Sequence, residues 1–378
     1  MKRKYIRTII AAALAAAALS IPAQAAEGAP SVSAKAAVLV EAETGRTLWE
    51  KNADEPMLIA RTTNLMTALV ALERCKLDEL VTIDPAWAGI EGSSMYLKEG
   101  QELTVRELLY GLMLASGNDA AVALANIAAG STEAFAALMN EKAAALGCRN
   151  THFENPSGLD SSGHYSSARD MATIMAEAIK NADFREITGT VSKAVGGSTY
   201  KNHNRLLTDC EGVFSGKTGY TMAAGRTLVS CCERQGVTVI CVTLSDPDDW
   251  RDHASLYDWI YENGAFRELI PSDSMWTVPV IGGERAETGI VPEGSLRIFL
   301  APDETASVTL RIPGFVYASV EALAPAGEAT AYIDGVEAGS VRLLFMQSVP
   351  KQEEKAPGFW EKLQTIFGIG KRRIYTLT

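Results

Sequence analysis

Three short polar motifs, widely spaced along the chain, constrain its fold more than any other feature. The tetrad R-T-T-N at 61–64 begins a stretch, 62–75, that is apolar on nearly every side of a helix. The triplets S-G-N at 116–118 and K-T-G at 217–219 follow, about a hundred residues apart. Because a helix that is apolar all round is buried, we predict that the tetrad, at its N-terminus, lies inside a domain.

The N-terminus has the pattern of a secretory signal peptide. Basic residues at positions 2, 3, 4 and 7 precede an apolar run over 9–19, and small residues at 23–25 provide a cleavage site. The alternative, an uncleaved membrane anchor, is disfavoured because the run is short for a spanning helix. We therefore predict that residues 1–25 are removed and that the protein is exported.

Charge and composition exclude several classes of protein. Setting aside residues 1–25, with their four basic and no acidic residues, leaves 31 basic and 46 acidic residues, a net charge of −15. Such a surface repels nucleic acid. The six cysteines show no framework spacing, so buried thiols are favoured, with Cys231 and Cys232 on opposite faces of a strand. The four histidines lie far apart, and no metal site is predicted.

Periodicity predicts an α+β fold with a mainly antiparallel sheet. A hairpin is expected over 34–50, and further strands at 226–232 and 237–244. Besides the buried helix over 62–75, helices are expected at 105–115, 120–129, 132–146 and 168–180. Between 181 and 213 the pattern is weak. Helices clustered between an N-terminal hairpin and later strands are typical of an α+β domain.

A small all-β domain is expected to follow. From about residue 271, alternating segments at 296–300, 307–312, 329–333 and 340–345 are separated by Gly and Pro turns, and Asp334-Gly335 is a hairpin signal. The predicted organisation is a signal peptide at 1–25, a first domain at 26–268, a β domain at 269–350, and a linker with an amphipathic tail at 351–378.

The tail combines aromatic and basic residues. Its apolar stripe consists of Phe359, Trp360, Leu363, Ile366 and Phe367, and residues 359–378 carry a net charge of +3. An aromatic stripe with basic neighbours favours contact between residues 359–373 and a membrane surface. Docking of this segment on the protein's own β domain is the alternative.

In this order, the motifs resemble those of the low-molecular-mass penicillin-binding proteins, the serine-type D-alanyl-D-alanine carboxypeptidases that trim peptidoglycan stem peptides. Further matching stretches are E-G-S-S-M at 91–95, residues 112–121, N-P-S-G-L at 155–159, Y-K-N-H-N at 200–204 and G-K-T-G-Y-T at 216–221. The resemblance implies a transpeptidase domain of the penicillin-binding-protein and β-lactamase type, and a stem peptide as partner. It also implies a location in the cell wall or at the outer face of the cytoplasmic membrane, and neither cofactor nor metal.

The tetrad departs from the S-x-x-K of this family at both chemical positions. Arg61 stands at the position of the nucleophile and Asn64 at that of the base. An arginine stays protonated and cannot accept an acyl group, and an amide has no basic lone pair. Thr62 and Thr63 are turned away from the face of residue 61. Losing nucleophile and base together should cost orders of magnitude in rate, so we predict an impaired or inactive member of the family.

The remaining motifs suit binding. By resemblance, Ser116 lines the same cleft, Asn118 hydrogen-bonds a substrate amide, and Lys217 with Thr218 holds a carboxylate. Gly219 lets an extended peptide align along the strand edge. A second cation at position 61 makes a bound carboxylate more favourable. The sequence thus predicts a protein that binds stem peptides, and β-lactams non-covalently, without cleaving them.

Several alternatives stay open. A working carboxypeptidase could use a displaced nucleophile, Ser116, with Lys217 nearby, and release of D-alanine would reveal it. The arginine side chain could instead plug the cleft. A β-lactamase is disfavoured by the additional β domain and tail. Finally, R-T-T-N could be a sequence change in an otherwise functional enzyme.

Overall fold

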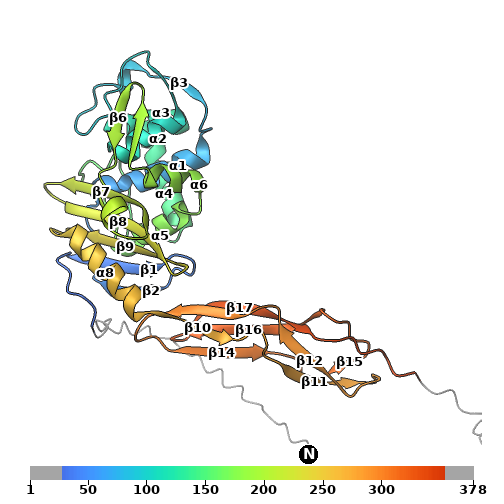
Figure 1. Ribbon diagram of the computed structural model, residues 1–378. Coiled ribbons are helices and arrows are strands. Elements are labelled where there is room, and N and C mark those ends of the chain that lie inside the picture. Colours follow the sequence, from blue (N-terminus) through green and yellow to red (C-terminus); the bar gives the residue numbers. More distant parts are fainter. Residues whose placement is uncertain (1–27, 354–378) are drawn as a thin grey trace, which may run out of the picture.

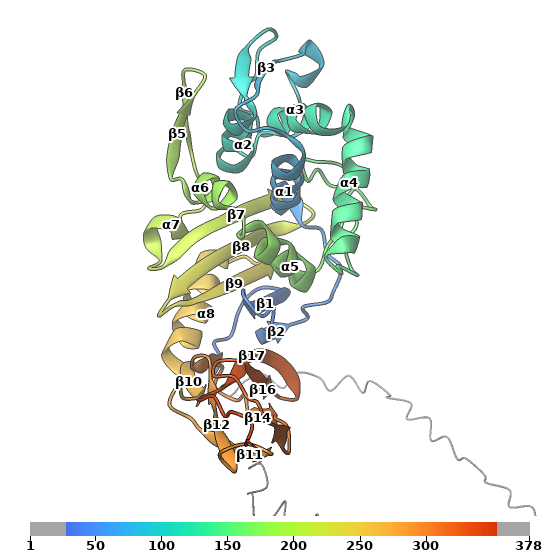
Figure 2. The same ribbon diagram turned by 90° about the vertical axis from the view of Figure 1, so that its right-hand side faces the viewer.

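The computed structural model describes residues 28–353, which form two regions (Figure 1). Helices and a five-stranded sheet make up the first region, and strands alone make up the second, which projects from the base of the first (Figures 1 and 2). The predicted α+β class, with a later all-β region, is confirmed. The predicted signal peptide at 1–25 and the tail from residue 354 onward lie outside the described residues.

The five-stranded sheet is antiparallel, with the order β2-β1-β9-β8-β7. Its strands are β1 (Ala36–Glu41), β2 (Thr47–Lys51), β7 (Val213–Thr221), β8 (Gly225–Arg234) and β9 (Val237–Leu244). The predicted hairpin and both predicted later strands are confirmed. Strand β7, which contains the K-T-G triplet, lies at an edge of the sheet, so one of its sides has no strand partner.

Both faces of this sheet are buried, which explains why its strands read as nearly continuous apolar runs. Val229 belongs to a core shared with the helices between β2 and β7. Leu228, on the other face, belongs to a second core that includes α8 (Asp249–Asn263). Cys231 and Cys232 fall in different cores, as the strand period predicts, and all six cysteines are free thiols.

The other helices of the first region are η1 (Ala60–Thr63), α1 (Asn64–Arg74), η2 (Pro85–Trp87), α2 (Val105–Leu114), α3 (Asn118–Ala129), α4 (Thr132–Ala145), α5 (Ala168–Ala178), α6 (Ala182–Gly189) and α7 (Leu206–Asp209). All five predicted helices are present, the first as η1 continued by α1. Two short hairpins, β3 (Leu80–Thr82) with β4 (Glu102–Thr104) and β5 (Ser192–Val195) with β6 (Ser198–Lys201), complete the region. Within residues 28–353 no single helix has the length and hydropathy to cross a membrane, and α3 with α4 meets that criterion only as a pair bent by 80°.

Side-chain caps determine where several helices begin. Thr104 and Glu107 form a reciprocal capping box at the start of α2. Ser131 and Ser167 accept backbone N–H groups at the starts of α4 and α5. Helix α3 ends at Gly130, whose φ of 81° is a left-handed conformation that glycine adopts readily. These local signals explain why the amphipathic pattern predicted these helices well.

The second region consists of β10 (Ala265–Ile270), β11 (Trp276–Ile281), β12 (Glu287–Pro292), β13 (Leu296–Leu300), β14 (Ala306–Arg311), β15 (Val316–Tyr317), β16 (Pro325–Ile333) and β17 (Val336–Phe345). Six of them form a sheet in the order β14-β16-β17-β12-β11-β15, and β10 pairs with β13. Positive φ angles at Asp334 and Gly335 suit the predicted tight turn between β16 and β17. Strand β10, which spans the predicted division after residue 268, pairs with β13 of the same region.

Candidate active site

The three motifs meet in one open cleft of about 480 Å³ between η1, the start of α3 and the edge strand β7. Of the predicted site residues, Arg61, Ser116, Thr218 and Gly219 line it directly. Lys217 reaches the cleft through Ser116, to which its ammonium group is hydrogen-bonded. Asn64 and Asn118 are buried behind the lining. The fold thus gathers residues that are more than a hundred positions apart.

Two glycines, one in β7 and one in the N-P-S-G-L loop, allow these segments to pack directly against the backbone around position 61. A Cβ atom at Gly219 would overlap Thr227 Oγ1 and lie 2.9 Å from the backbone nitrogen of Arg61, so β7 can approach η1 only without a side chain there. From the other side, a Cβ atom at Gly158 would overlap the carbonyl oxygen of Ala60. The backbone of η1 is therefore clamped between the K-T-G strand and the N-P-S-G-L loop.

The Arg61 side chain extends across the cleft. Its Nη1 donates to the carbonyl oxygen of Tyr220 at 3.3 Å, and its Nε is buried without a hydrogen-bond partner. Among residues 28–353 no carboxylate oxygen lies within 4.0 Å of the guanidinium. Burial lowers the pKa of Arg61, and the more distant Asp160 opposes this effect. The guanidinium thus lies in the cleft with its charge uncompensated by a close acidic group.

Thr62 and Thr63 do not enter the cleft, as the helix geometry predicts. Both are fully buried, and their hydroxyl groups donate to the carbonyl oxygens of Ile59 and Ala60 at 2.6 and 2.8 Å. Neither threonine lines the cavity. Their hydroxyl groups are therefore turned away from the cleft.

Asn64 lies one helical turn after Arg61, on the buried side of α1. Its Nδ2 donates to the carbonyl oxygen of Leu112 at 3.2 Å, while Oδ1 is buried without a partner. An amide in this position can neither accept a proton at ordinary pH nor carry a charge. Asn64 therefore cannot act as a base.

Ser116 and Lys217 form the closest polar contact of the cleft. Lys217 Nζ lies 2.5 Å from Ser116 Oγ and donates to the carbonyl oxygen of Thr218 at 2.9 Å. Burial, reinforced by the nearby Arg61, lowers the pKa of Lys217 to about 7. Ser116 has a φ of 54°, a left-handed conformation that is uncommon for serine and is often found at functional sites. The lysine is thus poised between its charged and neutral forms near neutral pH.

Asn118 is the first residue of α3 and connects the S-G-N triplet to the preceding loop. Its Nδ2 donates to the carbonyl oxygen of Glu91 at 2.6 Å, and its backbone N–H donates to that of Ser93 at 2.7 Å. In this state its amide nitrogen is engaged by the protein itself. The second N–H and Oδ1 of the same amide are the groups through which it could contact a substrate amide.

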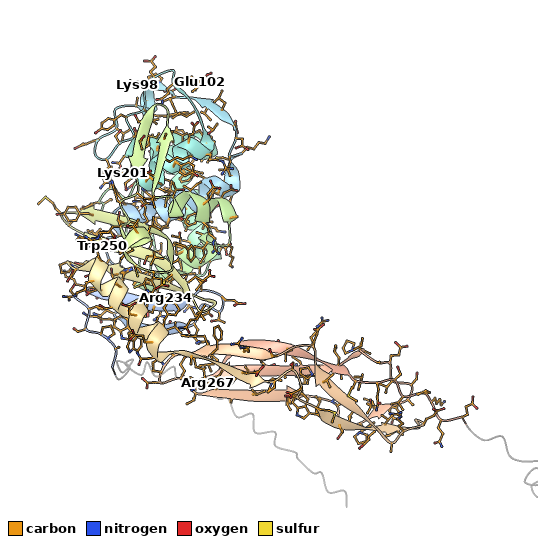
Figure 3. The ribbon with its side chains drawn as sticks, viewed as in Figure 1. Lys98, Glu102, Lys201, Arg234, Trp250 and Arg267 are labelled. Atoms are coloured by element: carbon orange, nitrogen blue, oxygen red, sulfur yellow. The ribbon has the colours of Figure 1, made fainter. Side chains whose placement is uncertain are left out.

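The cleft has six further lining residues, which the motifs alone did not single out. They are Ser93, His203, Tyr220, Arg226, Asp249 and Trp250. The first three lie in stretches that match the family, whereas the last three come from β8 and the start of α8. Arg226 Nη2 pairs with Asp249 Oδ1 at 2.5 Å, and its guanidinium lies 5.4 Å from the ring centroid of Trp250. Trp250 is labelled in Figure 3, at the start of α8.

The charged groups of the cleft are able to attract an anion. Arg61, and Lys217 when protonated, are positive, and the Arg226 charge is matched by Asp249. Burial, then Lys217 and Arg61, lower the pKa of His203. No cluster of three or more His, Cys, Asp or Glu suited to a metal occurs in the described part of the chain.

Similarity to known proteins agrees with this geometry. A family model described as D-alanyl-D-alanine carboxypeptidase matches residues 23–248. D-alanyl-D-alanine carboxypeptidase DacF of Bacillus subtilis is 40% identical over 221 residues, covering 56% of this chain and 57% of the relative. DacC of Escherichia coli is 34% identical over 302 residues, covering 71% and 74%. The match spans little more than half the length of the first relatives, DacF and the Escherichia coli DacA.

Solved structures extend the likeness to both regions. PBP3 of Streptococcus pneumoniae, a peptidoglycan synthesis regulatory factor, has a TM-score of 0.72 at 25% identity, covering 85% of this chain and 100% of that chain. Penicillin binding protein 5 of Haemophilus influenzae has a TM-score of 0.68 at 26% identity, covering 85% and 99%. The fold is thus that of a low-molecular-mass penicillin-binding protein. The chain belongs to the D-alanyl-D-alanine carboxypeptidase family.

Proposed function

We propose that this chain is an exported cell-wall protein that binds the D-Ala-D-Ala terminus of peptidoglycan stem peptides without cleaving it. The carrying observation is the Arg61 guanidinium, which extends into the cleft from the nucleophile position with no carboxylate close to it. The family supplies the ligand class. The signal-like sequence of residues 1–25 supports export to the cell wall or the outer face of the cytoplasmic membrane.

Two features favour binding of the peptide's terminal carboxylate. Arg61 and protonated Lys217 place two cations about one cleft, and a ligand carboxylate relieves their mutual repulsion. The open edge of β7 can pair with an extended peptide, as in other cases of strand addition. The same features suit non-covalent binding of a β-lactam, whose carboxylate carries the same charge.

Cleavage is disfavoured because no complete nucleophile and base remain at positions 61 and 64. An acyl-enzyme needs a hydroxyl or thiol at the place where the oxyanion donors converge. Arg61 fills that place, and Asn64 is held by Leu112. Peptide binding and peptide hydrolysis should therefore be separated in this protein.

One observation favours a second candidate, a carboxypeptidase that uses Ser116 as a displaced nucleophile. Lys217, with its pKa lowered to about 7, lies within hydrogen-bonding distance of Ser116 Oγ and could remove its proton. The two candidates predict opposite results with a penicillin. Only the second yields an acyl-Ser116 adduct.

A pair of ligands tests the proposed function directly. A peptide ending in D-Ala-D-Ala and the same peptide with an amidated C-terminus are compared by isothermal titration calorimetry, with D-alanine release assayed in parallel. We expect the peptide with a free C-terminal carboxylate to bind at least about tenfold more tightly than the amidated peptide. The amidated peptide cannot form charge-assisted hydrogen bonds through a carboxylate. No D-alanine should appear. Equal affinities, or steady release of D-alanine, would refute the proposal.

Binding should also depend on pH through Lys217. Its ammonium group is charged below its pKa of about 7 and neutral above it, so carboxylate affinity should fall as the pH rises. The affinity should decrease by up to about tenfold per pH unit between about pH 7 and about pH 8.5. Titrations of the wild type and of Lys217→Met measure this, and the slope should disappear in the variant. A pH-independent wild type would show that Lys217 does not contact the anion.

A further inference from the structure

The end of the β region farthest from the cleft exposes three large apolar side chains. Phe315 is 50% exposed and Tyr317 69%, and their rings lie edge to face with centroids 5.5 Å apart. Ile281, 47% exposed, is the register partner of Tyr317 in the parallel pairing of β11 with β15. We call these three residues the distal tip. Ile281 ends β11 and Tyr317 ends β15, and Figure 1 shows these two strands at the free end of the β region.

The chain leaves the described part of the protein beside this tip. Gln352 donates from its backbone N–H to the carbonyl oxygen of Gly282 at 2.8 Å, and Lys351 forms a bridge with Gly283. Both partners directly follow Ile281 in the sequence. The described chain therefore ends close to the tip. The tail, with its aromatic stripe and net positive charge, follows from residue 354.

We propose that the distal tip is a lipid-contacting surface that inserts Phe315, Tyr317 and Ile281 into the interface of an anionic membrane, next to the point where the tail begins. Aromatic side chains with a polar end, such as tyrosine, prefer the headgroup level of a bilayer. Next to Gly282 and Gly283 in sequence or pairing, the basic residues Arg285 and Lys351 are balanced by Glu284 and Glu353, so the tip contributes apolar contact rather than charge.

The size of the tip favours lipid over a second copy of the chain. A stable dimer usually buries about 800 Å² on each partner, with twenty or more residues. Three clustered side chains are far below that size, whereas insertion into an interface needs no complementary partner surface. Attraction of the basic tail to anionic lipid would hold the tip at the membrane surface. Binding through the tail and binding through the tip would then strengthen each other.

Vesicle binding of the mature full-length chain tests the proposal. The double variant Phe315→Ser/Tyr317→Ser is compared with Val336→Ser, whose valine is 65% exposed on the hairpin between β16 and β17. Residues 338–340 of that hairpin line the cavity beside the first region, so Val336 is far from the tip. With vesicles of phosphatidylglycerol and phosphatidylethanolamine, we expect the double variant to lower the partition coefficient about tenfold. Val336→Ser should leave it unchanged.

A labelling experiment gives an independent readout on the unmodified protein. Tyrosine iodination is mapped by mass spectrometry with and without these vesicles. Tyr317 should be protected by lipid, whereas Tyr96, 81% exposed in the first region, should not. Equal vesicle binding of the double variant and the wild type would overturn the proposal. So would protection of Tyr317 that is already complete without lipid, which would indicate docking of the tail on the tip.

Discussion

Replacing Arg61 by serine and Asn64 by lysine together should raise D-alanine release from a pentapeptide by about three orders of magnitude or more. Residues at these positions lie one turn apart, so a new hydroxyl and a new amine would meet on one face of the helix. The clamped backbone of η1, the Ser116–Lys217 contact and the open edge of β7 are already in place. Steady-state kinetics with a D-Ala-D-Ala peptide measures the gain.

The two single variants are the matched controls for this experiment. Because nucleophile and base act as a unit, Arg61→Ser alone and Asn64→Lys alone should each recover only a small part of the rate. Calorimetry of the double variant with the amidated and acid peptides shows that the cleft still binds. If the double variant binds the peptide but releases no D-alanine, the loss of activity has a cause other than residues 61 and 64.

The substitution Gly158→Ala should destabilise the protein by about 3 kcal/mol and loosen peptide binding. Gly158 has a φ of 78°, and its Cβ atom would overlap Ala60 and lie 2.9 Å from Thr63 Oγ1. These atoms belong to the backbone and to a fully buried side chain, so they cannot move aside cheaply. The displaced segment is the one that positions Arg61. Urea unfolding gives the free energy, and calorimetry gives the affinity.

Gly197→Ala is the matched control for the effect of the backbone conformation alone. Gly197 has a similar φ of 85°, but no atom lies within 4 Å of the position that a Cβ atom would occupy there. This variant should lose only about 1 kcal/mol, the cost of a left-handed alanine, and should keep its peptide affinity. Similar losses in the two variants would contradict the close packing of the N-P-S-G-L loop against η1.

The parts of the fold that the sequence predicted are those with strong local signals. The buried helix after Arg61 and the helices with serine or threonine caps all follow apolar periodicity. Helix α8 was missed because its buried side includes Asp249, Asp252 and His253, which interrupt the apolar pattern. Strand β10 lay across the predicted division because its pairing with β13 is a tertiary contact.

The candidate site, too, could be predicted from the sequence only in part. Motif order placed Arg61, Ser116 and the K-T-G strand around one cleft, which the structure brings together. Spacing could not reveal that Asn118 is engaged by Glu91, or that Arg226 and Asp249 also line the cleft. Both depend on loops and on a helix start whose positions follow only from long-range packing. The depressed pKa of Lys217 likewise depends on its burial, which no local pattern encodes.

The central claim is that the scaffold binds its ligand without forming an acyl-enzyme. Intact-mass spectrometry after incubation with a penicillin tests this claim most directly, with peptide mapping to locate any modification. The unmodified mass should persist at every time point, even where calorimetry shows that the ligand is bound. A mass increase equal to that of the β-lactam, mapped to Ser116 or another residue of the cleft, would contradict it.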